Sequence, residues 1–167
     1  MTDVHSSETR HYNMSRIKGK DTKPELIVRK YLFGKGFRYR LNVKGLPGKP
    51  DLVLPKYRTV IFIHGCFWHG HENCKYFVIP KTRTAWWTEK IGKNKERDQR
   101  THASLRETGW NIMTVWECQL KPQKRQETLE GIVTLLEKLW LDSNKKQYLT
   151  DKIINLAAET EVPYGQG

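Results

Sequence analysis

The sequence has no long apolar run, few acidic residues and only three cysteines. No segment is long enough to cross a bilayer, and the opening residues MTDVHSSETR lack the apolar centre of a signal peptide. We therefore expect a cytoplasmic, nucleoid-associated protein with no membrane partner. An odd number of cysteines in a reducing compartment argues against a disulfide framework and leaves metal binding or plain burial.

The shortage of acidic residues leaves a strongly basic chain. Lys and Arg outnumber Asp and Glu by 30 to 18, which gives a formal net charge of +12 at pH 7. This excess predicts a polyanionic partner, because neutralising phosphates and releasing counterions supplies most non-specific affinity for nucleic acid. A basic but inert surface is the alternative. At 167 residues and 37% hydrophobic content, the chain predicts one globular domain with its own core.

The order of elements predicts an α/β or α+β domain (22–142), preceded by an N-terminal arm (1–21) and followed by a tail (143–167). A helix is expected from Thr22, as N-cap, to Gly34 or Gly36. The other expected elements are a three-strand meander (37–43, 51–54 and 59–63), a basic helix (from 82 or 84 to about 109), a strand (110–117), an amphipathic helix (126–142) and a weak helix in the tail (153–158).

Residues 60–74, VIFIHGCFWHGHENC, carry the densest set of chemical groups. Asp51 begins a strand that should pair with 59–63, so its carboxylate and a backbone carbonyl near Ile63 could bind Mg²⁺ at the rim of the sheet. Such a cation offsets the charge that grows on the phosphoryl and leaving oxygens during phosphodiester cleavage. A simple Pro-Asp turn is the alternative.

Two histidines, His64 and His69, leave the end of the same strand beside Asp51. An imidazole there can take a proton from an attacking water at neutral pH. A lone histidine is more often structural, but two at one strand exit favour chemistry. This interpretation requires Asp51 and His69 to lie within about 10 Å of each other, close enough for a water-bridged partnership. Glu25 is explained by its capping-box position without a catalytic role.

The cysteines and a third histidine predict a metal site. Cys66, His71, Cys74 and Cys118 would form a tetrahedral set of soft ligands, as structural zinc requires, and the ion would fasten the loop 64–80 to the core. Spacing alone does not decide whether His69 or His71 is the ligand. Buried free thiols are the alternative reading.

Large aromatic residues stand among polar neighbours at two places. Phe67 and Trp68, with one of Trp86 and Trp87, lie amid Gly, His and Lys, so they are candidates for a wedge between base pairs. For the other tryptophans, Trp110, Trp116 and Trp140, we expect core packing.

With these residues in view, the chain resembles the very short patch repair (Vsr) DNA mismatch endonucleases. The matching stretches are DVHSSETRHYNMSRIKGKDTKPE, LPGKPDLVLPKYRTVIFIHGCFWHGH, TRTAWW with EKIGKNKERD, and GWNIMTVWEC, which cover most of residues 3–120. The resemblance implies a restriction-endonuclease-like α/β fold with a central mixed sheet flanked by helices. It also implies a structural zinc and Mg²⁺-dependent nicking 5′ of the thymine in a T:G mismatch, which arises when 5-methylcytosine deaminates.

The resemblance also implies roles for single residues. Asp51 is the metal carboxylate, His69 the general base, and His64 and Glu25 orient the attacking water. The implied wedge is Phe67, Trp68 and Trp87, the implied DNA contact of the arm is Met14, and the implied zinc ligands are Cys66, His71, Cys74 and Cys118. From its charge, the basic helix with Lys90 and Lys93 is expected to hold the DNA backbone. Contacts with other mismatch-repair proteins and a monomeric state are expected.

Three departures from the family pattern stand out. Ile63 occupies a position where threonine is expected, which keeps a backbone carbonyl and removes a hydroxyl. The run from His71 to Cys74 is one residue longer than expected, and the acidic-then-lysine signature of related nucleases is replaced by histidines.

Two rival functions are consistent with the same residues. The first is a zinc-stabilised nucleic-acid-binding protein without catalysis, which would leave Asp51 and His69 idle. The second is a zinc hydrolase with His64, His69 and His71 as ligands.

Overall fold

The computed structural model describes residues 8–9, 12, 15–16 and 19–159, and side chains as far as residue 150. Met14 lies outside the described residues. The named elements are the helices α2 (Lys23–Gly34), α3 (Thr84–Glu107) and α4 (Pro122–Glu159), the strands β1 (Leu52–Leu54), β2 (Thr59–His64) and β3 (Asn111–Trp116), and the short 3-10 helices Pro55–Tyr57 and Glu117–Leu120.

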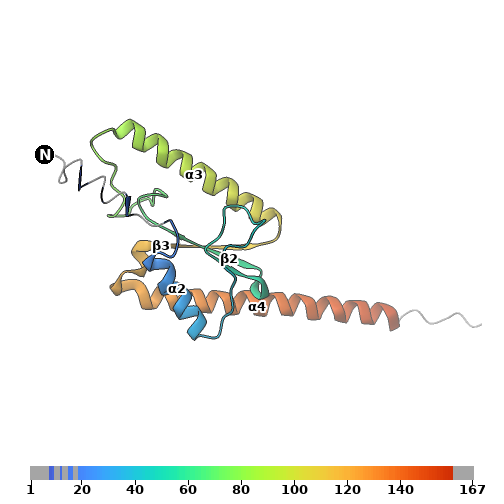
Figure 1. Cartoon of the computed structure of the whole chain (residues 1–167). Helices are drawn as coiled ribbons and strands as arrows, with labels where there is room; N and C mark the ends of the chain where they lie inside the picture. Colours follow the sequence, from blue (N-terminus) through green and yellow to red (C-terminus); the bar gives the residue numbers. More distant parts are fainter. Residues whose placement is uncertain (1–7, 10–11, 13–14, 17–18, 160–167) are drawn as a thin grey trace, which may run out of the picture.

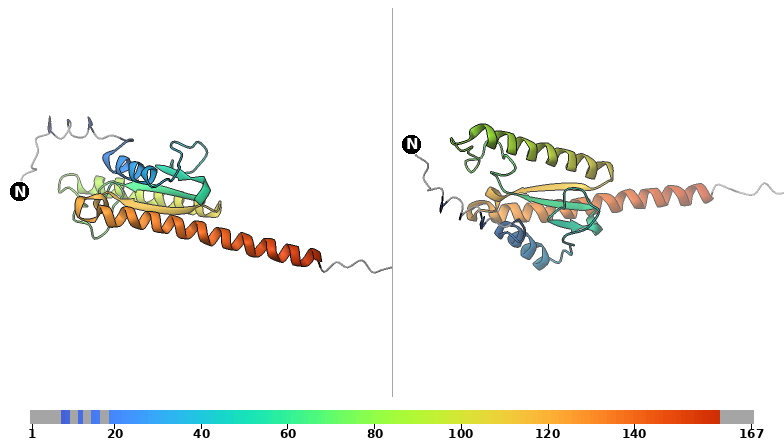
Figure 2. Two further views of the ribbon diagram at one scale, coloured as in Figure 1. Left: turned by 90° about the horizontal axis from the view of Figure 1, so that it is seen from below. Right: turned by 45° about the horizontal axis from the view of Figure 1, so that its top comes forward.

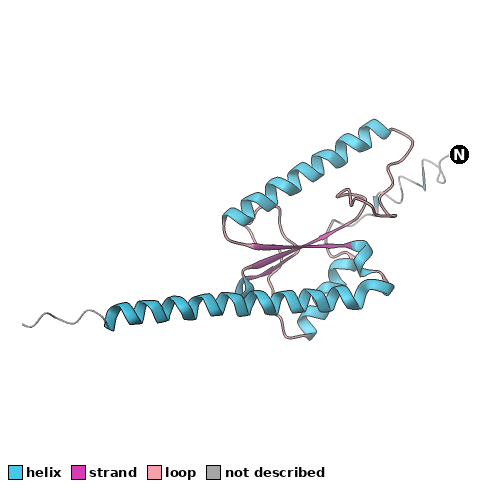
Figure 3. Cartoon of the chain, turned by 180° about the vertical axis from the view of Figure 1, so that it is seen from behind, coloured by secondary structure: helices cyan, strands magenta, loops and turns pink. Residues whose placement is uncertain are grey.

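A mixed three-stranded sheet lies between two layers of helices. The strand order is β1-β2-β3, with β1 antiparallel to β2 and β2 parallel to β3. Helix α3 covers one face, and α2 and α4 cover the other (Figure 1); the view from behind shows the same layers (Figure 3). Parallel neighbours need a crossover connection, which here contains α3. The predicted α/β class and the mixed sheet flanked by helices are confirmed.

The central strand β2 is apolar because both of its faces are covered. Ile61 packs toward α2 and α4, in a cluster that contains Leu32 and Leu136. Val60 and Phe62 point to the other face and pack with residues that include Leu105 of α3. This burial on both sides holds the end of β2 firmly, and the candidate functional residues follow directly after it.

The predicted meander is wrong. Residues 37–43 alternate in polarity, but they form only one isolated bridge, in which Arg40 and Val53 exchange backbone hydrogen bonds. Asn42 adopts a left-handed conformation with φ 51°, which ends the extended backbone after the bridge. The third strand of the sheet is therefore β3, which comes from much later in the chain.

Helix α4 is longer than expected. The sequence predicted a helix at 126–142 and a separate weak helix at 153–158, whereas one helix runs without interruption from Pro122 to Glu159. Neither glycine nor proline occurs between 143 and 159, so nothing forces a break. Its first half packs on the sheet through Leu129, Ile132 and Leu136, and its second half extends beyond the domain (Figure 2). In the described part of the chain, no helix has the length and apolarity needed to span a membrane.

Candidate active site and metal centre

A cleft of about 890 Å³ opens at the end of β2 that leads to the loop 64–80. Its walls come from the N-terminus of α2, the residues before β1, and the middle of α3. Asp51, His64 and His69 all line this cleft, as does Glu25. The structure therefore brings together the four residues that the sequence suggested for catalysis.

Asp51 is held in place by the neighbouring strand. Its Oδ2 accepts a hydrogen bond from the backbone N–H of Ile63 at 2.7 Å. Burial raises the pKa of Asp51 to about 6; the Ile63 N–H opposes this rise, the charge of Glu25 adds to it, and Arg29 and His69 lower it. A partly desolvated carboxylate beside a second acidic group is a suitable partner for a divalent cation.

Glu25 performs the capping role that its position predicted. Thr22 is the N-cap of α2, and its hydroxyl donates to Oε1 of Glu25 at 2.8 Å. The other oxygen, Oε2, accepts from the backbone N–H of Asp21 at 2.9 Å and from Arg29 at 2.7 Å. The buried carboxylate is therefore satisfied by Arg29 of α2 and by the two residues just before the helix, while Glu25 faces the cleft.

The two cleft histidines are stacked. The rings of His64 and His69 lie 3.7 Å apart between centroids, with their planes inclined by 8°. Nδ1 of His69 lies 2.6 Å from Oδ2 of Asp98, a residue of α3. This geometry fits the tautomer in which Nδ1–H donates to the carboxylate and Nε2 is free to accept a proton. Burial, with help from His69, lowers the pKa of His64 to about 4, so His64 is neutral at pH 7.

Asp98 is the site residue that sequence reasoning missed. It is one of several acidic residues on a helix rich in Lys and Arg, and an acidic residue there is ordinarily expected to form a surface ion pair. Donor atoms of His64, His69 and Asp98 lie within 4.8 Å of one another, the spacing of a metal site. However, stacked parallel rings direct their in-plane lone pairs side by side rather than at a common point, so this group is better suited to holding a proton than to holding an ion.

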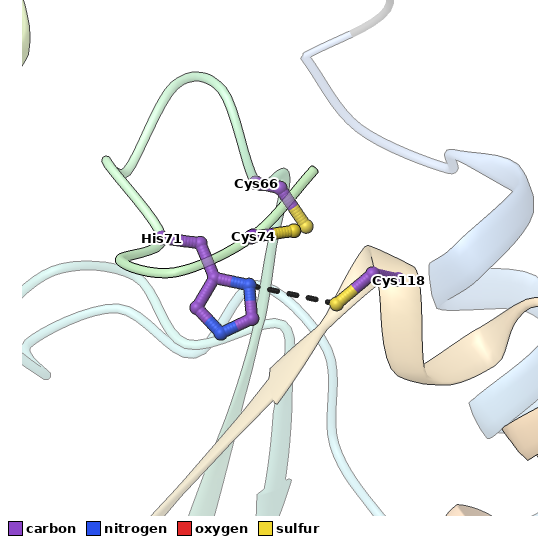
Figure 4. A group of neighbouring side chains, drawn as sticks. All are labelled: Cys66, His71, Cys74 and Cys118. Atoms are coloured by element: carbon purple, nitrogen blue, oxygen red, sulfur yellow. Dashed lines mark hydrogen bonds between the residues drawn. The ribbon is translucent and has the colours of Figure 1, made fainter. Parts of the chain in front are cut away.

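The four predicted zinc ligands come together. One ligand atom from each of Cys66, His71, Cys74 and Cys118 lies within 4.8 Å of the others, and Nδ1 of His71 is 3.5 Å from Sγ of Cys118 (Figure 4). The parallel pairing of β2 with β3 explains why Cys118, which is distant in the sequence, joins this group. His64 pairs with Trp116, and a cysteine follows each of them by two residues: Cys66 after His64 and Cys118 after Trp116.

The chemistry of this group fits a metal ion. All three cysteines are free thiols, and burial raises the pKa of Cys66 to about 12. Burial also raises the pKa of Cys118, and a soft divalent ion would supply the positive charge that stabilises thiolates in this small space. The ring of His71 is fixed by stacking on Trp116, with 4.0 Å between centroids and planes 2° apart. His71 therefore belongs to the metal group and His69 to the cleft, which separates two of the three histidines that a zinc hydrolase would have needed together.

The residues predicted to form a wedge lie in one aromatic cluster. Phe67 lies 5.3 Å from Trp68 and 5.2 Å from Trp87, and Trp68 lies 6.0 Å from Trp87, all between ring centroids. Trp68 also lines the cleft, so the cluster adjoins Asp51, His64 and His69. Trp86 is 42% exposed and its ring lies beneath the cation of Lys90.

The remaining predicted residues have mixed outcomes. Lys90 and Lys93 are exposed on α3, and Lys93 pairs with Glu89 at 2.6 Å. Trp140 does not pack in the core as expected: it is 39% exposed, and Lys56 lies over its ring.

Comparison with known proteins identifies the family. The model of the family "DNA mismatch endonuclease Vsr" matches residues 2–75. The DNA mismatch endonuclease Vsr of Escherichia coli (strain K12) is 46% identical over 141 residues, which cover 84% of this chain and 88% of the relative. The type II nicking enzyme V.NmeAIP of Neisseria meningitidis serogroup A is 53% identical over 121 residues, which cover 72% and 86%. The type II nicking enzyme V.XorIIP of Xanthomonas oryzae pv. oryzae is 48% identical over 120 residues, which cover 72% and 88%.

These matches and the cleft define the class of protein as a DNA endonuclease. The chain belongs to the Vsr family of DNA mismatch endonucleases.

Proposed function

We propose that this protein nicks one strand of duplex DNA on the 5′ side of the thymine in a T:G mismatch, by Mg²⁺-dependent hydrolysis of the phosphodiester, and so starts very short patch repair. The observation that carries the proposal is that Asp51 and His69 face one cleft and each is oriented by a partner. Membership of the Vsr family supports the DNA substrate and the mismatch. The restriction-endonuclease-like fold and a cytoplasmic location belong to the same proposal.

The acidic end of the cleft would hold the catalytic cation. Its ligands would be the Asp51 carboxylate and the backbone carbonyl of Ile63; the side chain at position 63 is not needed for this contact. Mg²⁺ supplies positive charge that offsets the negative charge growing on the phosphoryl and leaving oxygens. Glu25 adds negative potential beside Asp51, and hydrogen bonds from Asp21 and Thr22, at the start of α2, keep it in position.

His69 would act as the general base. Its Nε2 takes a proton from the water that attacks phosphorus, while Asp98 keeps Nδ1 protonated and stabilises the positive charge that the ring acquires. His64, neutral and stacked on His69, keeps the base in one orientation and excludes other conformations of the ring.

The rest of the site would recognise the distorted duplex. The cluster of Phe67, Trp68 and Trp87 would enter the base stack, a step that costs less at a mismatch than at a paired step. Lys90 and Lys93 would contact the DNA backbone, and Met14 on the arm would contact the minor-groove side. Zinc bound by Cys66, His71, Cys74 and Cys118 would fix the loop that carries the wedge. The protein would act as a monomer, with other mismatch-repair proteins as further partners.

A strand-specific nicking assay tests the proposal. One labelled duplex carries T:G and its twin carries C:G, each with and without Mg²⁺. We expect nicking of the T:G duplex alone, only with Mg²⁺, and loss of nicking but not of duplex binding in Asp51→Ala. Asp142→Ala, at an exposed position of α4, is the matched control. Nicking by Asp51→Ala at the wild-type rate would refute the metal assignment, and binding without cleavage in any divalent cation would favour the passive binding protein.

A further inference from the structure

His102 is a cleft histidine with no part in the proposed chemistry. It lies on α3 one helical turn after Asp98 and lines the same cleft as Asp51 and His69. Its half-buried ring packs on Phe62, with 5.2 Å between centroids, and lies 6.3 Å from the ring of His64. The carboxylate of Asp98 is taken by His69. Among residues 19–150, no hydrogen bond engages a ring nitrogen of His102.

A loop meets α3 at the same end of the cleft. Gly48 has φ +71°, and a Cβ built on it would stand 2.2 Å from Cγ2 of Thr101. This close approach brings the following residue, Lys49, to the turn of α3 that carries Thr101 and His102. Lys49 is exposed and lines the cleft. Lys49, Thr101 and His102, each of which carries a hydrogen-bond donor, thus line this part of the cleft.

We propose that Lys49 and His102 bind the DNA phosphate next to the scissile one and so position the strand for cleavage. The inference rests on the proposed nicking of DNA. His102 follows Asp98 by four residues, or about 6 Å along the helix axis, so it faces a different phosphate from the one beside His69. Phosphate contacts of this kind fix the register of a protein on the duplex.

The surroundings of His102 suit an anion. Burial and the positive charge of Arg106 lower the pKa of His102, so the ring is neutral at pH 7 and donates one N–H. The charge of Arg106 is felt at this end of the cleft, and Lys49 adds a second cation. The neutral N–H of His102 and the ammonium group of Lys49 contribute differently to phosphate affinity. The contribution of the N–H depends on hydrogen-bond geometry, and that of the ammonium group depends on ionic strength.

Variants at position 102 separate hydrogen bonding from packing. His102→Phe keeps a ring against Phe62 and removes the donor, while His102→Asn keeps an N–H donor. We expect His102→Phe to weaken binding of the T:G duplex about tenfold, the size of one lost hydrogen bond to a charged group, and to change kcat little. His102→Asn should recover part of this loss. Gln99→Ala, on an exposed position of α3, is the control.

The substrate can be changed in the same experiment. A single methylphosphonate, which lacks the anionic oxygen, replaces each phosphate near the nick in turn. At the contacted phosphate, the methylphosphonate should cost His102→Phe less affinity than it costs the wild type, because the variant has only the Lys49 contact left to lose. At every other phosphate, the loss of affinity caused by the methylphosphonate and the loss caused by His102→Phe should add. Lys49→Ala should lower the slope of log affinity against log salt by about one phosphate, whereas His102→Phe should leave the slope unchanged.

Three results would overturn the proposal. They are equal binding by His102→Phe and the wild type, a methylphosphonate penalty that is the same in both proteins at every phosphate, or a lower kcat with a shifted pH profile and unchanged binding. The last result would assign His102 to proton transfer. Binding is measured without Mg²⁺, so failure of the wild type to nick T:G would refute the proposed function without removing this readout.

Discussion

The cost of ionising Asp51 in the folded protein can be measured directly. Its pKa is about 6, against an ordinary value of 3.8, because burial disfavours the charged form. A difference of about 2 pKa units corresponds to about 3 kcal/mol at roughly 1.4 kcal/mol per unit. We therefore predict that Asp51→Asn, which keeps an acceptor oxygen for the Ile63 N–H, is more stable than the wild type at pH 7.5 by up to about 3 kcal/mol.

The sign of the effect fixes its pH window. The protonated carboxyl favours the folded state, so its contribution is complete below pH 3.8 and is lost as the pH rises through 6. Asparagine does not ionise. The stability difference between Asp51→Asn and the wild type should therefore be largest above pH 6 and approach zero near pH 4.

Urea denaturation of both proteins from pH 4 to 8, without added Mg²⁺, gives the two stability curves. Groups far from Asp51 titrate equally in both proteins and cancel in the difference. Asp142→Asn, at an exposed position, should remain within about 0.5 kcal/mol of the wild type throughout. A wild type that is as stable as Asp51→Asn at pH 7.5, or a difference that does not change with pH, would refute the reasoning.

Three further changes test the architecture of the site. Asp98→Asn should reduce the nicking rate by about 10²–10⁴-fold with duplex affinity unchanged, because the tautomer of His69 is no longer enforced; a rate within twofold of wild type would contradict this role. Gly48→Ala should destabilise the fold by about 2–4 kcal/mol through its left-handed φ and the clash with Thr101, and Thr101→Ser, which removes Cγ2, should recover part of this loss in a denaturation cycle. Cys74→Ser should lose one equivalent of bound metal by elemental analysis and unfold at lower temperature, and unchanged metal content would refute the assigned ligand set.

Much of the fold could be predicted because local signals agreed with tertiary structure. The cap at Thr22 placed the start of α2, and the apolar run before His64 identified the strand buried on both faces. The alternation of residues 37–43 was a misleading signal. It was satisfied by a single bridge at Arg40, because the left-handed Asn42 prevents the backbone from continuing along the sheet. Alternation reports which side chains are buried, and it does not report whether a ladder of hydrogen bonds forms.

The site was predictable to the extent that its residues lie on one short segment. The Cys and His residues of the loop 64–80 were found from composition alone, and Cys118 was added because it follows a strand. Asp98 and His102 were not found, because α3 reads as a basic surface helix and no local pattern says which of its faces meets β2. These two residues face the cleft because α3 lies in the crossover between the parallel strands β2 and β3, and a local sequence pattern does not reveal this connection.

The cleft and the metal group are coupled through one compact turn. After β2, the backbone closes on itself: the N–H of His69 donates to the carbonyl of Gly65 at 3.2 Å, and that of His71 donates to the carbonyl of Cys66 at 2.9 Å. Side chains from this turn reach the cleft, the metal group and the aromatic cluster. A metal ion that fixes Cys66 and His71 therefore also fixes His69 and the wedge between them. In the proposed function, mismatch binding, proton removal and ion binding would therefore all depend in part on residues 65–71, and a change in one of these residues should affect the others.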